Sequence, residues 1–378
     1  NFHMAGWEND VSFNFTAPSV IKSPWGGEKE ILPSRVIALI GRNGSGKSTF
    51  LSRLARVSHA SVKDRMNKLK ELGSIQPEGI GFPRIITFSY SAFDSFHLPG
   101  VTIAEKEQIV NDVEKGEGRF IFCGLRDITK ELRLDISKQD SLASHQENKD
   151  RLTQTLLKPI NVLADEFVRS LELVEKNNQV DLLDSALEIV SSDPSFGLTH
   201  DMMTFETLRV DAREAFLGWS TGHKIVMQII INMVAYIVPR SLVLLDEPET
   251  HLHPPLLATL MHTVRYILDD KKAFAIVATH SPVVVQETLS KHVIIVRREG
   301  KLTETVQSSI ETFGENIGTL TGEVFGFVAT ATDYHKVLRK LANKFDDIKE
   351  IEALFVERGL SLQARAYLMS LFALKEDE

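Results

Sequence analysis

The residues most able to do chemistry begin with a glycine-rich octet, Gly41–Ser48, that fits G-x-x-x-x-G-K-[ST] in full. Glycines let backbone amides curl around phosphates, and the N-terminus of the helix that follows attracts the same anions. Lys47 would reach the β- and γ-phosphates, and Ser48 would hold Mg²⁺. The octet therefore predicts a nucleoside triphosphate site. The candidate ATP-binding residues are Asn43, Gly44, Ser45, Gly46, Lys47, Ser48 and Thr49.

Two adjacent carboxylates supply the second half of the chemistry. Asp246 and Glu247 directly follow the apolar run Leu242–Leu245, which predicts a buried strand with both acids at its carboxyl end. That end of a strand is where open α/β sheets bind ligands. Two acids near a triphosphate repel it unless a cation neutralises them, so Mg²⁺ is expected. We assign Asp246, with Ser48, to the metal, and Glu247 to polarising the attacking water.

A histidine completes the predicted site. His280 follows the next apolar run, Phe274–Ala278, and stands 33 residues after Glu247. By itself such a histidine is more often structural. Because neighbouring strand ends converge on one site, we expect His280 to face the γ-phosphate and the water.

The elements that must position these residues form an α/β pattern in two stretches. Val36–Ile40, Ile85–Tyr90, Leu242–Leu245, Phe274–Ala278 and Val293–Val296 are apolar runs typical of buried strands, and Val11–Phe15 alternates like a half-buried one. Helices are expected from Lys47, over Ile225–Val238 and over Pro254–Leu268. Strand–helix alternation indicates a largely parallel sheet. We predict an ATPase lobe at 1–97, a mostly helical insertion at 98–210, a second ATPase lobe at 211–310 and a helical C-terminal region at 311–378.

Composition excludes several classes of protein. The net charge of −8 argues against a chain drawn to nucleic acid by its overall charge, and the single cysteine, Cys123, excludes an intrachain disulfide and a cysteine-built zinc site. No apolar run approaches the length that spans a bilayer, and no secretory signal is visible. We therefore expect a cytoplasmic protein that does not associate with membranes.

These motifs, in this order, resemble an ABC-type ATPase head. The run Asp246–Pro254 followed by Thr279–Pro282 is similar to the branch that contains RecF, the SMC proteins and the OLD-type ATPases. The resemblance implies a mixed sheet with flanking helices, and ATP bound between two heads in a self-dimer or higher oligomer. It also implies that a signature loop of one head faces the phosphate loop of the other.

The signature and the glutamine loop depart from the family pattern. Trp219–Lys224 lacks the usual Ser-Gly-Gly but keeps Ser220 and Gly222 ahead of an expected helix, so these two are the candidate ATP-contacting residues of the partner head. The alternative is that Ser220 is an ordinary helix cap. The segment Phe88–Asp94 lies where the glutamine loop belongs but holds no glutamine, so coupling through Ser91 or Asp94 stays open.

A narrower resemblance concerns the output of the protein. Ser89–Asp94 together with Phe122–Asp127 is similar to PtuA, the ATPase of Septu and retron-associated antiphage systems. That resemblance implies a PtuB-like HNH nuclease partner, and DNA or retron RNA–DNA as a nucleic-acid partner. The apolar stripe from Leu338 to Leu354 could dock such a partner or fold onto its own core.

Three alternatives remain open. The chain could be an SMC- or RecF-like ATPase of DNA repair or chromosome maintenance, or a scaffold that uses ATP only to dimerise. The third is a transporter ATPase subunit, against which the missing glutamine loop and standard signature argue. A basic cluster at 53–70, with a local charge of +5, is by default a solvated helix face, and a nucleic-acid patch is the alternative.

Overall fold

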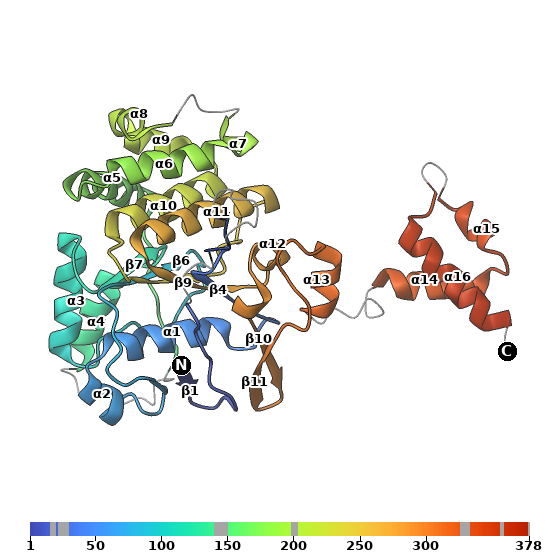
Figure 1. Ribbon diagram of the computed structural model, residues 1–378, viewed down its shortest axis with the longest axis horizontal. Coiled ribbons are helices and arrows are strands. Elements are labelled where there is room, and N and C mark those ends of the chain that lie inside the picture. The colour runs from blue at the N-terminus through green and yellow to red at the C-terminus, as the bar shows by residue number, and fades with distance from the viewer. Residues whose placement is uncertain are drawn as a thin grey trace. The chain divides into compact units, whose positions relative to one another are not determined.

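The computed structural model describes residues 1–15, 20–21, 30–139, 150–197, 203–325, 333–355 and 359–376. The chain divides into two compact units, Asn1–Leu320 and Thr321–Glu378 (Figure 1). Within the described residues, no helix is both long enough and apolar enough to cross a bilayer.

The first unit is built around a seven-stranded sheet with strand order β11-β10-β4-β9-β8-β6-β7. Only β11 runs antiparallel to its neighbour, and every other pair is parallel. The sheet is therefore mixed, which confirms the predicted α/β class. Its strands are β4 (Val36–Gly41), β6 (Ile85–Ser89), β7 (Phe120–Gly124), β8 (Leu242–Asp246), β9 (Phe274–Thr279), β10 (Val293–Glu299) and β11 (Leu302–Gln307).

Two short ribbons accompany this sheet, and helices cover it on both sides. The ribbons pair β1 (Phe2–Met4) with β5 (Gly73–Ile75) and β2 (Val20–Ile21) with β3 (Glu30–Ile31). The helices of the first unit are α1 (Lys47–His59), α2 (Val62–Asn67), α3 (Ile103–Lys115), α4 (Ile128–Gln139), α5 (Ile160–Lys176), α6 (Val180–Ser191), α7 (Pro194–Gly197), α8 (Phe205–Val210), α9 (Ala212–Gly218), α10 (Thr221–Tyr236), α11 (Pro254–Lys271), α12 (Pro282–Gln286) and η1 (Ser290–His292), with α13 (Ile317–Glu323) spanning the unit boundary.

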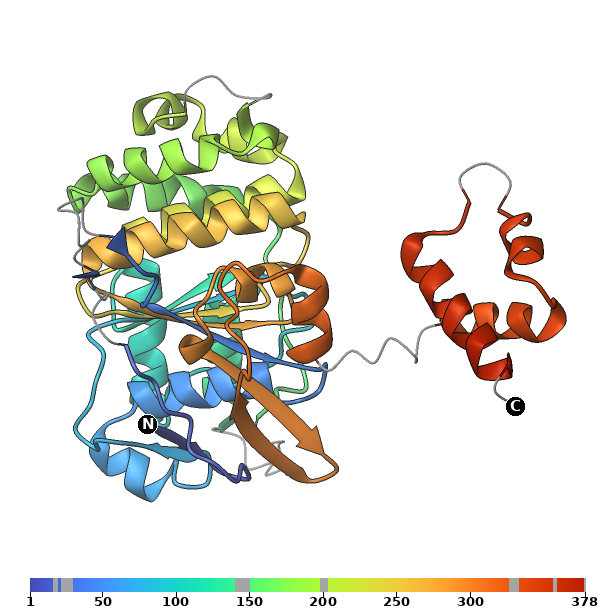
Figure 2. The ribbon, with the colours of Figure 1, turned by 45° about the vertical axis from the view of Figure 1, so that its right-hand side comes forward.

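The helices form layers about the sheet (Figures 1 and 2). Helix α1 covers one face, and its Phe50 and Leu54 share a core with Ile37 and Leu39 of β4. Helices α10 and α11 cover the other face, and α5 and α6 pack on them as an outer layer. Because it lies between two layers, α10 is buried nearly all round, as its run of Ile, Val and Met indicates.

Several expected elements differ from those observed. Val11–Phe15 is not a strand: Val11 makes one isolated bridge to Phe2 and the chain then continues irregularly. Strand β11 was not expected, because its polar sequence Leu-Thr-Glu-Thr-Val-Gln lacks the apolar run of a buried strand and it lies at the sheet edge. Strand β7 falls within 98–210, the range expected to be an insertion, and it belongs to the central sheet.

The second unit has a small core of its own. Helices α14 (Asp333–Lys344), α15 (Ile348–Glu352) and α16 (Leu362–Glu376) bury Leu338, Ala342, Ile351 and Leu368 among them. Most of the apolar stripe predicted in this region therefore folds onto its own neighbours. Leu354 is the exception, since about half of its surface is exposed.

Candidate nucleotide-binding site

The sheet brings the three predicted motifs to one edge. Strand β4, which leads into the phosphate loop, pairs with β9, and β9 pairs with β8. The register sets Ile40 beside Thr279, and Ala278 beside Asp246. Because these strands are parallel, their carboxyl ends lie together, and the residues that follow them share a site.

The phosphate loop needs its glycines for geometric reasons. Gly46 caps the N-terminus of α1 with φ 105°, and Gly44 has φ 79°, values that side chains disfavour. At Gly41 a Cβ would lie 2.5 Å from the carbonyl oxygen of Val296 on β10. The loop is therefore fixed in a curl that only glycine permits at these positions. Asn43 and Gly44 are exposed on this curl, and Thr49 is half-buried in the first turn of α1.

Lys47 folds back over the loop that carries it. Its Nζ donates to the carbonyl oxygen of Gly41 at 2.9 Å and lies 3.4 Å from that of Arg42. Burial lowers the pKa of the Lys47 ammonium, while the charges of Glu247 and Asp246 act in the opposite direction. The ammonium is thus held at the centre of the loop with acids facing it, where a bound phosphate would compete for it.

The predicted metal ligands are in contact. The Ser48 hydroxyl donates to Oδ1 of Asp246 at 2.9 Å, although the two residues are 198 positions apart. Burial raises the pKa of Asp246 to about 7, and the charges of Asp94 and Glu247 add to this rise while the Ser48 hydrogen bond opposes it. A cation at Asp246 would offset the cost of burying its charge.

The donor set fits Mg²⁺ and a phosphate chain. A hydroxyl and a carboxylate are oxygen ligands of the kind Mg²⁺ takes when it also binds substrate phosphates. Among the described residues, the buried hydroxyls of Ser45, in the loop, and Ser89, beside Asp246 in the sheet register, have no hydrogen-bond partner. Such orphaned polar groups are costly to bury, which is consistent with a polar ligand in their surroundings.

Glu247 and His280 lie side by side next to this pair. The backbone of Glu247 takes φ 47°, and its amide donates to the carbonyl oxygen of Ala278 at 2.8 Å. His280 Nδ1 is 3.7 Å from the Glu247 carboxylate, and about half of the His280 side chain is exposed. The two predicted catalytic residues are thus brought together at the open edge of the sheet, within reach of an incoming water molecule.

Glu249 is a site residue that the sequence analysis missed. Its Oε1 accepts from the Thr279 hydroxyl at 2.8 Å and from the His280 amide at 2.7 Å, and it lies 3.2 Å from His280 Nδ1. Glu249 therefore fixes the turn that carries His280. The available signal was the acid two residues after Glu247 in the run Glu-Pro-Glu.

The predicted signature residues are not joined to the phosphate loop of the same chain. Ser220 is exposed and caps α10, where its Oγ accepts from the His223 amide at 3.3 Å. Gly222 packs closely against the loop after Glu247, since a Cβ there would lie 3.0 Å from the carbonyl oxygen of His251. In the described parts of the chain no contact links Ser220 to Gly41–Ser48, so its role toward ATP stays a prediction.

Asp94, one of the two candidates in the glutamine-loop position, is buried beside the metal-binding pair. With Ser48 and Asp246 it lines a cavity of about 40 Å³. Its Oδ1 accepts from Nη1 of Arg126 at 3.2 Å and from the Phe96 amide at 3.1 Å. Ser91 instead accepts from the amide of Phe93 on the surface.

Arg126 extends this contact toward the helical layer. The guanidinium is fully buried and also binds Glu131 of α4, at 2.6 Å to Oε2. Oε1 of Glu131 accepts from the Leu156 amide at 2.8 Å, a few residues before α5 begins. A continuous chain of polar contacts thus runs from Asp94 to the segment that leads into α5. Sequence reasoning gave no role to Arg126 or Glu131: Arg126 lies in the segment Phe122–Asp127, but nothing in the sequence marks it as the partner of Asp94.

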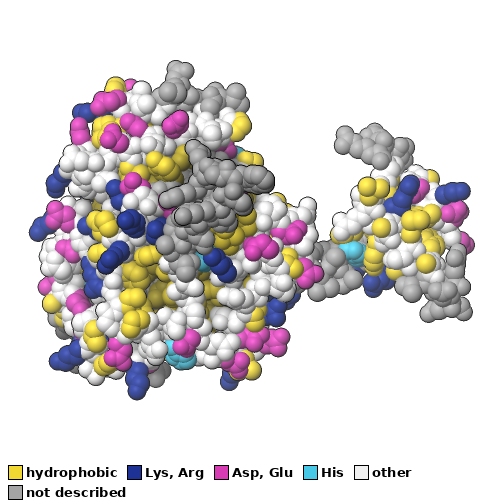
Figure 3. All heavy atoms as spheres, viewed as in Figure 1, with side chains coloured by type: hydrophobic (Ala, Val, Ile, Leu, Met, Phe, Trp, Pro, Cys, Tyr) yellow, Lys and Arg dark blue, Asp and Glu magenta, His cyan; other side chains and the backbone are white. Residues whose placement is uncertain are grey.

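The basic cluster at 53–70 is solvated only in part, since Lys63, Lys68 and Lys70 are exposed whereas two of its arginines are buried. Arg53 is buried and forms a bidentate pair with Asp150 at 2.7 Å. Arg65 is buried and donates to four backbone carbonyls, among them those of Ala60 and Ser58. These two cations are structural, so the local charge of +5 overstates what a nucleic acid could meet. On the face of the first unit seen in Figure 3, Lys and Arg side chains are interspersed with Asp and Glu.

Comparisons with known proteins place part of the chain beside described families. Residues 124–286 match the family described as "AAA domain, putative AbiEii toxin, Type IV TA system". The matched part includes Ser220, Asp246, Glu247 and His280 and begins after the phosphate loop. The chain is 32% identical over 348 residues to Protein ea59 of Escherichia phage lambda, covering 87% of this chain and 62% of that protein. The chain thus spans less than two thirds of that relative's length.

Solved structures with a similar arrangement include an SMC head domain from Thermotoga maritima, at 12% identity and a TM-score of 0.33, covering 82% of this chain and 98% of that one. A nucleotide-free ATP-binding cassette of an ABC transporter has 13% identity and a TM-score of 0.34, covering 84% and 93%. The complete phosphate-loop motif and the family match together support an AAA-type P-loop ATPase domain.

Proposed function

We propose that this protein binds Mg-ATP and hydrolyses it with an activated water, without a covalent intermediate. The observation that carries the proposal is the 2.9 Å contact between Ser48 and Asp246, with Glu247 and His280 on the adjoining strand ends. A hydroxyl and a carboxylate from distant parts of the chain meet where the phosphate loop opens, which is the arrangement phosphoryl transfer needs.

Each residue has a distinct task in this proposal. The loop amides and Lys47 bind and orient the phosphates, while Ser48 and Asp246 hold the cation. When bound, Mg²⁺ would neutralise charge on the phosphate oxygens. Glu247 orients the attacking water and takes up its proton, and His280, fixed by Glu249, faces the γ-phosphate.

Replacing Glu247 by Gln tests hydrolysis directly. The variant keeps the shape of the side chain but loses the charge that polarises water, so turnover should fall by about 100-fold or more while ATP binding persists. Steady-state ATPase assays and nucleotide titration measure the two effects separately. Lys301→Ala, in the exposed β10–β11 turn, is the control. Undiminished turnover in Glu247→Gln would rule out this role for Glu247, whereas a wild-type protein that binds ATP without measurable turnover would favour the ATP-dimerised scaffold.

The same proposal includes a head-to-head dimer in which Ser220 and Gly222 contact ATP held by the other head. It is supported by the exposure of Ser220 at the N-terminus of the 16-residue helix α10, where unpaired amides attract phosphate. Each site would then need residues from two chains.

For the output we propose that the dimer gates a PtuB-like HNH nuclease in antiphage defence, with DNA or retron RNA–DNA as the nucleic acid sensed. This rests on the resemblance of Ser89–Asp94 and Phe122–Asp127 to PtuA, and on a family description that names a toxin of a Type IV TA system. An SMC- or RecF-like role in DNA maintenance is the second candidate, because the same ATPase core would serve it.

Removing residues 321–378 tests where the partner binds. That unit has its own small core, so the remaining chain should stay folded and keep its ATPase activity. We expect the truncated protein to lose its co-purifying nuclease in a pull-down analysed by mass spectrometry. Retention of the nuclease by a folded truncation would shift the partner surface to residues 98–210.

A further inference from the structure

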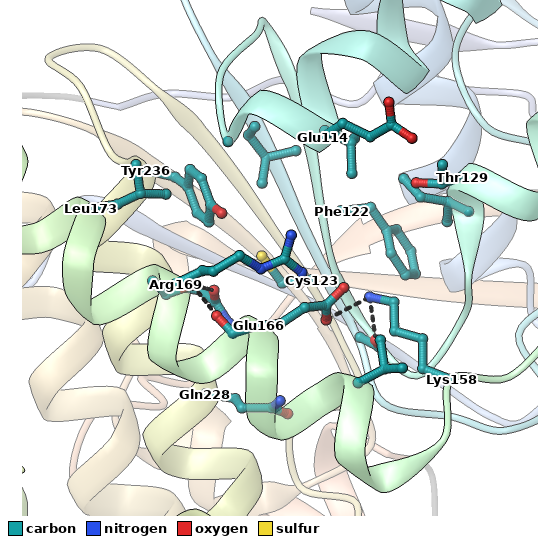
Figure 4. A pocket seen from close by; sticks show the side chains of 18 of the residues that line it. Glu114, Phe122, Cys123, Thr129, Lys158, Glu166, Arg169, Leu173, Gln228 and Tyr236 are labelled. Atoms are coloured by element: carbon teal, nitrogen blue, oxygen red, sulfur yellow. Dashed lines mark hydrogen bonds and ion pairs between the residues drawn. The ribbon is translucent and has the colours of Figure 1, made fainter. Parts of the chain in front are cut away.

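A second cavity lies apart from the nucleotide site, between the β7 edge of the sheet and the helices that cover it (Figure 4). Its volume is about 320 Å³, at the lower end of the roughly 300–1,000 Å³ typical of small-molecule sites. Strand β7, the end of α3, and helices α5 and α10 all contribute to its wall. A ligand of modest size could therefore contact both the sheet edge and its helical cover.

The wall contains buried polar side chains. The Tyr90 hydroxyl is buried, and the described residues give it no hydrogen-bond partner. The Gln228 side chain is only 4% exposed, and it lines the same cavity. Asn232 accepts from the Ser170 hydroxyl at 2.7 Å, which leaves its amide group for another acceptor. Leaving a hydroxyl such as that of Tyr90 unpaired is costly, so the cavity offers donors and acceptors to a polar ligand.

The charge of the wall favours neither an anion nor a cation. Four acidic and four basic residues line the cavity, so its formal charge sums to zero. The most buried of these cations is already paired, because Lys158 donates to Glu166 at 2.8 Å and lies 3.3 Å from the carbonyl oxygen of Gly124 (Figure 4). An anion placed on Lys158 would break this pair, whereas a neutral molecule would leave it intact.

Aromatic rings complete the lining. Phe122 of β7 and Tyr236 at the end of α10 lie on opposite sides of the view in Figure 4. Aromatic faces of this kind stack on flat heterocycles. A carboxamide presents one donor and one acceptor side by side, the pattern that matches the edge of a base. The lining thus combines ring faces with an amide that can read a heterocycle.

From these observations we propose that this cavity is a binding site for an uncharged nucleobase or nucleoside, separate from the ATP site. Gln228 would pair with the edge of the base, and Tyr90 and Asn232 would donate to its oxygen or ring nitrogen atoms. The proposal concerns binding alone, so it does not depend on whether the protein hydrolyses ATP.

Calorimetric titration with free bases and nucleosides, at saturating ATP, tests the proposal. At least one of the purine or pyrimidine compounds should bind to the full-length protein at one site per chain. Tyr90→Phe and Gln228→Leu should each weaken that binding by about tenfold, the scale of one lost hydrogen bond in a dry site. Gln108→Leu, on the exposed face of α3, is the matched control and should bind as the wild type does.

Two further measurements keep the outcome clear. Tyr90→Phe removes an unpaired hydroxyl, so the melting temperature of the free protein should stay equal or rise, which separates lost binding from lost fold. Lys47→Ala should lose ATP but keep the heterocycle. Absence of binding by every base and nucleoside would overturn the proposal. So would wild-type binding by both cavity variants, or loss of binding in Lys47→Ala, since the ligand would then occupy the ATP site.

Discussion

The phosphate-loop side and the signature side of this protein differ in how much of a site one chain provides. Around the phosphate loop, Lys47, Ser48, Asp246, Glu247 and His280 meet through contacts that a single chain supplies. On the signature side, Ser220 is exposed, and the side-chain hydrogen bond that it makes among the described residues is to its own helix. The sheet therefore assembles the candidate catalytic half within one chain, whereas the signature half, if it acts on ATP, must do so from another molecule.

The largest effects on turnover should come from inactivating each side in a separate variant and then mixing the two variants. Ser220→Arg should abolish turnover while leaving ATP binding to its own phosphate loop intact, and Lys47→Ala should abolish both. In an equal mixture, mixed dimers carry one intact site, so activity should return to about a quarter of wild type for a two-fold dimer with independent sites. ATPase assays on the mixture measure this.

The control for this experiment is proof that mixed dimers form, for example by affinity capture through a tag on one variant only. A mixture as inactive as either parent, with mixed dimers present, would show that the two sides do not complete each other. Ser220 would then be the helix cap that its contact with His223 already describes.

The site residues that could be predicted from the sequence are those that directly follow a recognisable strand in the chain. The phosphate loop, the two acids and His280 each follow an apolar strand, and parallel pairing then places them together. Arg53 could not be interpreted in this way, because its partner Asp150 is 97 residues away and outside any pattern. Arg126 and Asp94 do lie in the two segments quoted for the PtuA resemblance, but their buried pair joins positions 32 residues apart and could not be predicted from either segment alone.

The position of each segment within the sheet explains where the predicted strands were wrong. The buried strands carry apolar runs that are visible in the sequence. Strand β11 lies at the edge of the sheet and pairs with one neighbouring strand only, so its sequence can be polar. Val11–Phe15 alternates like a strand and yet finds only one bridge. Alternation reports a half-buried segment, and the available neighbours decide whether it pairs.

The next effect concerns Glu249, which belongs to the catalytic side but acts through His280. Glu249→Ala removes the acceptor of the Thr279 hydroxyl and the His280 amide, so the turn should loosen and turnover should fall by about tenfold. Glu249→Gln keeps an oxygen in the same place and should recover much of the activity. Turnover at saturating ATP, with the affinity for ATP measured separately, distinguishes this positioning role from a binding role. Equal activity in all three proteins would remove Glu249 from the site.

The smallest effect is a pH dependence within the catalytic side. Burial raises the pKa of Asp246 from its ordinary value of 3.8 to about 7. Between these values the folded, metal-free protein holds a proton that the unfolded chain releases, so the free energy of unfolding should decrease as pH rises through this window.

Mg²⁺ competes with the same proton on Asp246. Its apparent affinity should therefore fall about threefold between about pH 7.5 and about pH 6.5. Urea unfolding without metal and Mg²⁺ titration at fixed ATP measure the two effects. Asp246→Asn should lose both pH dependences and gain stability over the wild type above pH 7, because it no longer buries a charge. A wild-type pH profile in Asp246→Asn would assign the titration to another group and leave the cation without its proposed carboxylate.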